Sequence, residues 1–355
     1  MNFKLVHQIP PSQNNPRNSE GAFLRGKHGE ILFAYSRYCG SSKEDNAACD
    51  IALIVSYDEG ETWSSPRIIA PAAFFGVKNV MSVSALHQQN GDLAFYFLIK
   101  ENGDELTSTL GRALSADGIN WTCERCKCNF PSAYYVVNND RIVRLSDGSL
   151  IAPAAIYTET RDQSARKSIS YATALISHDD GKSFERTEWV FSPAEITPWT
   201  RGFEEPGIIE YADRLYYWIR TDLGRQYECI STGSAEEFCF PRPSIFTSPR
   251  SPMQIKTVDG TSYAVYNPIP RYDGRVELGE SWGRTPLVIR KSEDGGNTWG
   301  QLNVIEDDEE RGFCYPAIFA TRDSSLLLAY CRGNAEDGDT LCRLGIAKIG
   351  IDSIE

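Results

Sequence analysis

The sequence lacks any long apolar run. No stretch approaches the roughly 20 apolar residues that a membrane-spanning helix needs, and the first residues hold no apolar run long enough for a signal peptide. We therefore expect a cytoplasmic protein without a membrane partner, unless the chain is a trimmed mature form. A helical hydrophobic period of useful length is also missing, and no glycine-rich phosphate loop follows a strand.

Positive charge is scarce. The chain has 36 Lys and Arg residues against 48 Asp and Glu residues, which gives a net charge of −12 and an isoelectric point near 5.0. Such a surface repels both nucleic acid phosphates and anionic membranes. We therefore expect no nucleic acid partner, and any anionic ligand would need a local basic pocket.

Cysteine is more frequent, with 10 residues. Cys123, Cys126 and Cys128 form a C-x-x-C-x-C cluster, but no fourth ligand stands at the spacing typical of a zinc site. A metal site there stays an alternative, and reduced thiols on a strand or turn are the favoured interpretation. We expect neither a metal nor a cofactor.

The clearest positive feature is an internal repeat. Segments 56–63 and 292–299 share the pattern Ser-x-Asp-x-Gly-x-Thr-Trp, 177–184 and 115–121 are close variants, and 231–238 keeps only the two ends. The copies recur at roughly 60 residues, a period that divides the 355 residues into six units. That unit is the size of a four-stranded propeller blade with long loops.

The repeat predicts the fold and its own role. Apolar strands precede the copies, and the Asp-x-Gly step makes a tight turn in which Gly takes a positive φ. The aromatic residue at the end then folds back between adjacent blades. We predict an all-β protein, a single six-bladed β-propeller over residues 1–355, with these turns structural and remote from the active site.

The repeats resemble the Asp boxes of the sialidase (neuraminidase) superfamily, and the chain is most similar to its bacterial Asp-box or BNR-repeat branch. The resemblance covers almost the whole chain and implies three catalytic residues. Tyr315 opens the first strand of the last blade, where the family has its nucleophile. Glu205 takes the place of the paired glutamate. Asp45 matches the acid/base in its loop by spacing, and Asp50 is the rival.

The resemblance also implies a group of carboxylate-binding arginines. Arg220 follows Glu205 by about fifteen residues, as in the family, and Arg284 precedes the last Asp box. Arg37 begins the loop that carries Asp45. A polar stretch before an apolar strand could bind sugar hydroxyls or be a plain turn, and its members are Asn139, Asp140 and Arg141.

One departure from the family bears on the substrate. Sialidases open with an Arg-Ile-Pro motif that supplies the first of three arginines, and Glu20 occupies that place here. Arg17 lies three residues earlier and could reach the site only with a different loop. An acid at this point would weaken recognition of a sugar carboxylate.

The expected function is retaining hydrolysis of a terminal sialic-acid-like sugar from a glycan. A neutral tyrosine avoids the repulsion that a carboxylate nucleophile would meet from the substrate carboxylate. Two other classes stay open: a hydrolase or lyase for a different sugar, with Glu20 binding a hydroxyl or amine, and a carbohydrate-binding propeller without catalysis. An interaction scaffold ranks third. The sequence leaves the oligomeric state open.

Overall fold

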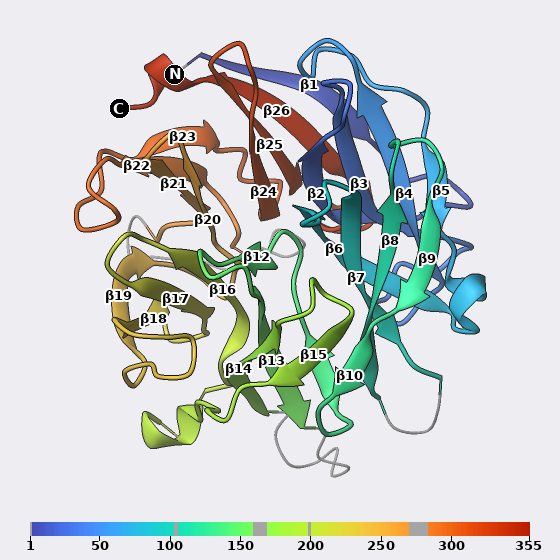
Figure 1. Cartoon of the computed structure of the whole chain (residues 1–355). Helices are drawn as coiled ribbons and strands as arrows, with labels where there is room; N and C mark the ends of the chain where they lie inside the picture. The colour runs from blue at the N-terminus through green and yellow to red at the C-terminus, as the bar shows by residue number, and fades with distance from the viewer. Residues whose placement is uncertain (1, 103–105, 159–168, 198–199, 270–282) are drawn as a thin grey trace.

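Strands dominate the computed structural model, which describes residues 2–102, 106–158, 169–197, 200–269 and 283–355. Within these ranges no helix is long and apolar enough to cross a membrane. The described strands form five hydrogen-bonded sheets placed around a common centre (Figure 1). Short 3-10 helices lie at the periphery: η1 (Ala72–Phe75), η2 (Pro193–Glu195) and η4 (Ile351–Ser353).

The five sheets resolve into six blades. The eight-stranded sheet consists of two antiparallel units joined only by the parallel pair Cys49 and Asn79. We number the blades in chain order and give their strands from the inside outward. Blade 1 is β2 (Asn18–Arg25), β3 (Ile31–Tyr38), β4 (Cys49–Ser56) and β5 (Arg67–Ala70), and blade 2 is β6 (Asn79–His87), β7 (Leu93–Lys100), β8 (Ser108–Ser115) and β9 (Thr122–Arg125).

Blade 3 has an inner strand in two parts, β11 (Tyr134–Val136) and β12 (Val143–Arg144), and both pair with its second strand. The remaining strands of blade 3 are β13 (Leu150–Thr158), β14 (Ile169–Ser177), β15 (Ser183–Arg186) and, beyond them, β10 (Lys127–Asn129). Blade 4 is β16 (Glu204–Glu210), β17 (Leu215–Arg220), β18 (Arg225–Ser231) and β19 (Arg242–Thr247). Blade 5 is β20 (Gln254–Val258), β21 (Thr261–Tyr266), β22 (Leu287–Ser292) and β23 (Asn303–Glu306).

Blade 6 closes the ring. Its first three strands come from the end of the chain, and the fourth is the N-terminal strand, β1. Figure 1 shows the two ends of the chain close together beside this blade. The blade consists of β24 (Cys314–Ala320), β25 (Ser325–Cys331), β26 (Leu344–Gly350) and β1 (Phe3–Ile9). The all-β propeller predicted from the repeats is therefore confirmed.

The Asp boxes form the turns between the third and fourth strands of five blades. In the first copy, Ser56 Oγ donates to Asp58 Oδ1 at 2.8 Å and accepts from the Gly60 amide at 2.8 Å. Trp63 Nε1 then donates to the Gly60 carbonyl at 3.0 Å. The same serine-to-aspartate bond recurs in the copies at 115, 177 and 292. These contacts are local, as expected for structural turns.

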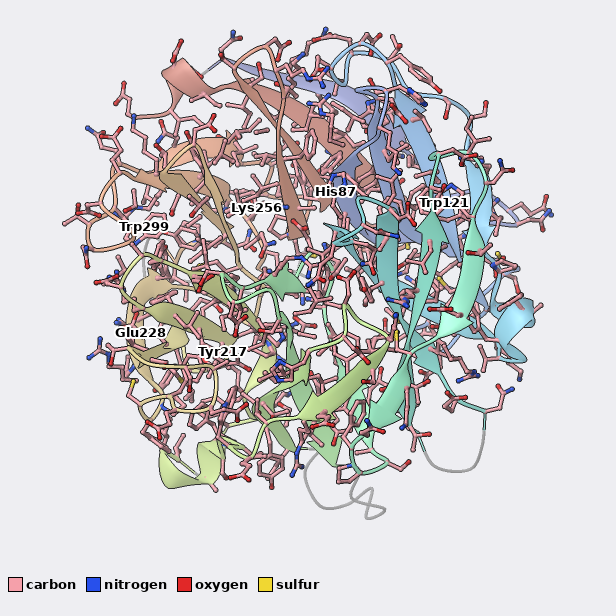
Figure 2. All side chains as sticks on the ribbon, viewed as in Figure 1. His87, Trp121, Tyr217, Glu228, Lys256 and Trp299 are labelled. Atoms are coloured by element: carbon pink, nitrogen blue, oxygen red, sulfur yellow. The ribbon has the colours of Figure 1, made fainter. Side chains whose placement is uncertain are left out.

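The hydrophobic core lies between blades. The largest buried clusters each combine residues of neighbouring blades, such as blades 6 and 1 or blades 3 and 4. Trp63 packs into the cluster shared by blades 6 and 1. A Cβ on Gly60 would come within 2.7 Å of Leu327 in the next blade, so the tight turn also needs glycine for packing. Trp121 and Trp299, from two other boxes, appear on opposite sides of the ring in Figure 2.

Antiparallel pairing fixes which face carries which loops. Within a blade, the inner strand and the third strand run in the same direction. The start of an inner strand and the end of a third strand therefore lie on opposite faces of the ring. The Asp boxes follow third strands and occupy one face. The loops that enter the inner strands occupy the other face, and candidate site residues should be sought there.

Candidate active site

The inner strands share a backbone irregularity that aims side chains at the centre. Register shifts interrupt β2, β6, β16 and β24, and each bulge contains one non-glycine residue with positive φ. A bulge bends the strand and redirects its side chain, at a cost in backbone strain. These residues are Glu20 (φ 56°), Ser82 (61°), Glu205 (41°) and Tyr315 (56°), and Asp140 (54°) lies between the two parts of the blade 3 inner strand.

A cavity of about 670 Å³ opens where these bulges meet, a size suited to a small sugar. It is polar and contains groups from several blades. Six residues singled out in the sequence line it: Glu20, Asp45, Glu205, Arg220, Arg284 and Tyr315. The structure therefore brings together the three candidate catalytic residues and the two arginines expected to bind a carboxylate.

Tyr315 and Glu205 form a hydrogen-bonded pair in the cavity. The Tyr315 hydroxyl donates to Glu205 Oε1 at 2.9 Å, although the residues are 110 positions apart. Burial and the Glu205 charge raise the pKa of the Tyr315 phenol well above its usual value, against the opposing effect of Arg220 and Arg284. The phenol is therefore protonated at rest, with a carboxylate placed to accept its proton during a reaction.

The two arginines approach this pair from adjacent blades. Arg220, at the end of β17, is bonded to Glu205 Oε2, and its Nη1 lies 3.5 Å from the Tyr315 hydroxyl. Arg284, just before β22, has its guanidinium carbon 5.6 Å from the centre of the Tyr315 ring. Its Nη1 donates to Cys314 Sγ at 3.1 Å. The phenol oxygen thus lies in a positively charged setting that can receive an anionic group.

Asp45 lies on the other side of the cavity in the loop between β3 and β4. Its side chain is 68% exposed, and Arg17 holds it with an Nη1 to Oδ1 distance of 2.6 Å. Lys100 and Asn79 of blade 2 fix the backbone of the loop by donating to the Asp45 carbonyl at 2.6 and 3.1 Å. Although partial desolvation inside the cavity acts to raise it, the pKa of Asp45 is lowered overall by the charges of Arg17 and Lys100.

Glu20 and Arg17 form a buried pair beside Asp45. Arg17 Nη2 donates to Glu20 Oε1 at 3.0 Å, and the Ser82 hydroxyl donates to Glu20 Oε2 at 2.5 Å. Arg17 also stacks on the Tyr38 ring at 4.4 Å. Its side chain is only 3% exposed, so it bridges two carboxylates instead of reaching the cavity. Burial raises the pKa of Glu20, partly offset by Arg17 and Ser82.

Several other candidates lie outside the cavity. Asp50, the rival acid, accepts from the Ala72 amide at 2.8 Å on the outer side of blade 1. Arg37 contacts Cys39 Sγ at 3.7 Å and does not line the cavity. Arg37 lies in β3 and Asp50 lies in β4, so neither belongs to the loop between these strands that positions Asp45.

The polar stretch at 139–141 ties blades together. Asn139 Nδ2 donates to the carbonyls of Gly21 and Tyr315, at 3.0 and 3.3 Å. Arg141 is buried and bonded to the Met253 carbonyl at 2.6 Å. Asp140 pairs with Lys256 at 3.1 Å, and Figure 2 shows that lysine near the centre of the ring. These side chains are used in contacts between blades and do not line the cavity, so the hydroxyl-binding role expected of them lacks support.

Sequence reasoning missed other residues that line the cavity. Ser82 occupies the blade 2 bulge, and Lys100 ends β7. Glu204 precedes the candidate base and is only 2% exposed. Arg250 contacts it from the loop before β20. Among these residues, only Ser82 had a signal in the sequence, which is its position. It precedes the Asp box of its blade much as Glu20 precedes the box of blade 1.

Metal ligands do not gather in the described part of the chain. No group of three or more His, Cys, Asp or Glu side chains there could hold an ion. All ten cysteines are free thiols. Of the sequence cluster, Cys126 is buried in the core between blades 2 and 3, and Cys123 Sγ lies 3.2 Å from the Ile69 carbonyl.

Comparisons with known proteins agree with this architecture. A family model described as a BNR repeat-like domain matches residues 29–328. No curated protein matches the sequence. The Hadza microbial sialidase Hz136 superposes with a TM-score of 0.72 at 16% identity, over 96% of this chain and 66% of that one.

Two further solved structures extend the comparison. The NanB sialidase of Streptococcus pneumoniae gives a TM-score of 0.69 at 13% identity, over 99% of this chain and 71% of that one. A protein of unknown function from Dyadobacter fermentans gives 0.70 at 15% identity, over 98% and 99%. At these identities the likeness shows a shared fold, which is that of sialidases.

Proposed function

Since the chain belongs to the family of BNR repeat-like domains, we propose that it is a sialidase-like retaining exo-glycosidase. Its substrate is a glycan that ends in a sialic-acid-like sugar. Tyr315 is the nucleophile, Glu205 its base and Asp45 the acid/base. The single observation that carries the proposal is the 2.9 Å hydrogen bond between the Tyr315 hydroxyl and Glu205, in a cavity that also holds Arg220 and Arg284.

The first half of the reaction uses the Tyr315 and Glu205 pair. As the phenol oxygen attacks the anomeric carbon, its proton passes to Glu205 and the bond to the leaving oxygen breaks. Arg220 and Arg284 bind the substrate carboxylate, because the guanidinium fork matches two oxygens at once. The same cations stabilise the phenolate character that develops on Tyr315.

Asp45 serves the leaving group from the opposite side of the cavity. It gives a proton to the departing glycan oxygen in the first step, then removes one from water in the second. Water attacks the anomeric carbon, and the bond to Tyr315 breaks with return of the proton from Glu205. The exposed position of Asp45 suits contact with a large leaving group at the mouth of the cavity.

Glu20 favours a second candidate. Its carboxylate takes the place where related enzymes have an arginine, and it lines the cavity. A hydrolase or lyase for a different sugar could use Glu20 to accept a hydrogen bond from a hydroxyl or amine. The retained Tyr315, Glu205 and Asp45 argue against a propeller that only binds carbohydrate, since binding alone does not require all three.

Turnover of aryl glycosides by the full chain tests the proposal. The panel contains an aryl α-sialoside, aryl glycosides of neutral sugars and an aryl glucuronide, with the first-formed anomer read by NMR. We expect turnover of the sialoside with retention of configuration. Faster turnover of a neutral sugar would favour the second candidate, and inversion would exclude Tyr315 as nucleophile. Binding of a sialoside without turnover would indicate a carbohydrate-binding propeller without catalysis.

A further inference from the structure

The wall formed by blades 4 and 5 contains a carboxylate surrounded by arginines. Arg250 Nε donates to Glu204 Oε2 at 2.6 Å, and its Nη2 is bonded to Glu204 Oε1. Arg220 Nε lies 3.7 Å from the same Oε2. Glu204 is buried, with 2% of its side chain exposed, whereas Arg250 is 36% exposed. One edge of the Arg250 guanidinium is therefore anchored on Glu204, and the other edge faces the cavity.

The anchored guanidinium keeps one amino group for another partner. Nε and Nη2 of Arg250 face Glu204, and Nη1 makes no hydrogen bond to any residue that the structure describes. Because the guanidinium is planar and rigid, the bidentate contact also fixes the direction of Nη1. A side chain held in this way loses little conformational entropy when it binds a ligand.

Arg250 is also close to the two arginines already assigned to the site. Arg284 Nη2 donates to the Arg250 carbonyl at 3.4 Å, which joins the start of blade 5 to the loop before β22. Arg220 lies between Glu204 and Glu205. In this group three arginines face two glutamates. Three guanidinium groups gathered on one wall suit the binding of a carboxylate.

The blade 1 wall offers the opposite charge. Glu20 replaces the cation that the resemblance places there, and Arg17 is occupied by Glu20 and Asp45. A substrate carboxylate would be repelled on this side. Any third cationic contact has to come from elsewhere in the cavity.

We propose that Arg250 is a specificity-determining residue that binds the substrate carboxylate together with Arg220 and Arg284. The carboxylate site is then built from blades 4 and 5 only, and Glu20 with Ser82 accepts a hydrogen bond from a sugar hydroxyl. The inference rests on the proposed function, since it concerns how the same anionic sugar is held. Glu204 acts as the positioning residue that aims Arg250.

Two ligands that differ in one group test the inference. The probes are the 2,3-unsaturated analogue of sialic acid and its C1 carboxamide, and calorimetry gives Kd for each at one ionic strength. We expect Arg250→Gln to weaken carboxylate binding about tenfold or more, the effect of one lost hydrogen bond to a charged group. Carboxamide binding should change less than about twofold.

A matched control separates this effect from a general loss of charge. Arg242 also pairs with a glutamate, Glu228 at 3.0 Å, but lies on β19 and does not line the cavity. Arg242→Gln should change neither Kd. Equal weakening of both ligands by Arg250→Gln, or no weakening at all, would overturn the inference and leave Arg250 as a counter-ion only.

A double variant removes ambiguity from misfolding. Arg250→Gln leaves Glu204 buried with less compensation, which can destabilise the protein. Arg250→Gln with Glu204→Gln removes both charges, and it should show the same selective loss of carboxylate binding with a normal melting temperature. If the wild-type chain hydrolyses the sialoside but no variant shows selectivity, only the Arg250 inference fails. If the wild type neither binds nor hydrolyses sialic ligands, the proposed function fails and the inference fails with it.

Discussion

The two walls of the cavity use the same backbone device for different chemistry. In blades 1, 2, 4 and 6 a bulge in the inner strand, with one residue at positive φ, turns a side chain inward. Blades 4 and 6 place Glu205 and Tyr315 there, in hydrogen-bond contact. Blades 1 and 2 place Glu20 and Ser82 there, also in contact. The scaffold fixes where groups converge, and the residue types decide what they do.

The difference between the walls lies in their charge balance. Beside Tyr315, Arg220 and Arg284 approach the phenol ring and its hydroxyl, so the wall can receive an anion. Beside Glu20, the buried cation Arg17 is shared by two carboxylates: Arg17 lies 3.0 Å from Glu20 and 2.6 Å from Asp45. A substrate held between the walls would present its carboxylate to one and its hydroxyls and leaving group to the other. The predictions below test this division.

The largest effect should come from Tyr315→Phe, which removes one oxygen. We expect kcat on an aryl sialoside to fall at least about 10³-fold, since loss of a nucleophile removes the covalent route. Kd for the 2,3-unsaturated analogue should change little, because both arginines remain. Steady-state kinetics and calorimetry give the two values, and circular dichroism checks the fold. Wild-type turnover by this variant would exclude Tyr315 as nucleophile.

On the opposite wall, the role of Asp45 should appear as a dependence of kcat/KM on the leaving group of the substrate. Asp45→Asn should lower kcat/KM about 10²-fold for a natural glycan and about tenfold or less for a nitrophenyl sialoside, because a good leaving group needs less protonation. Asp50→Asn is the control, as Asp50 does not line the cavity. Equal losses on both substrates would assign Asp45 a binding role instead of proton transfer.

Removing the Glu20 carboxylate should make the two walls more alike in charge. Glu20→Gln keeps the size of the side chain and removes its charge. Affinity for the carboxylate probe should rise about three- to tenfold, the effect of roughly 1 kcal/mol of lost repulsion, while affinity for the carboxamide should not rise, because that probe keeps only the hydroxyl contact to this side chain. Weaker carboxylate binding in this variant would mean that Glu20 supports the anion site, and the division into two walls would be wrong.

The pH dependence of stability should distinguish Glu20 from Asp45, the two carboxylates that pair with Arg17. The pKa of Glu20 is raised by burial, so the folded chain binds more protons than the unfolded chain between the usual and the raised value. Stability from this group falls as pH rises through that window. The pKa of Asp45 is lowered overall, despite partial desolvation in the cavity, by Arg17 and Lys100. Stability from Asp45 is present above its usual pKa and is lost as pH falls through the lowered one.

Glu20→Gln removes only the first of these two dependences. The stability of the wild type relative to this variant should therefore decrease as pH rises from the usual glutamate pKa towards neutrality. Urea unfolding at several pH values measures it. A difference that grows with pH would show that Arg17 stabilises ionised Glu20 more than burial destabilises it.

Sequence patterns predicted several residues of the Tyr315 wall but missed Arg250, for a physical reason. Glu205, Arg220, Arg284 and Tyr315 each stand in a local sequence context that resembles that of the sialidases, so the resemblance located them. Arg250 has no such motif, and its relation to Glu204 depends on how blades 4 and 5 meet.

The residues that were misread or left open depend on contacts between blades. Arg17 reaches Asp45 because both belong to loops at one end of blade 1, which only the folded ring brings together. Asn139 and Arg141 point to neighbouring blades and hold the centre of the ring. A polar side chain near the axis of a propeller can serve a ligand or the scaffold, and the sequence pattern is the same for both.

The smallest effect should come from the face opposite the cavity. Ser56 is buried in the first Asp box, where its hydroxyl accepts from the Gly60 amide and donates to Asp58. Ser56→Ala should lower the free energy of unfolding by about 1–2 kcal/mol, because a buried amide loses its partner. Ligand affinity and kcat should stay unchanged, since the turn follows a third strand and the candidate catalytic groups lie on the opposite face. A loss of activity in the folded variant, measured below its melting temperature, would mean that the boxes are coupled to the site.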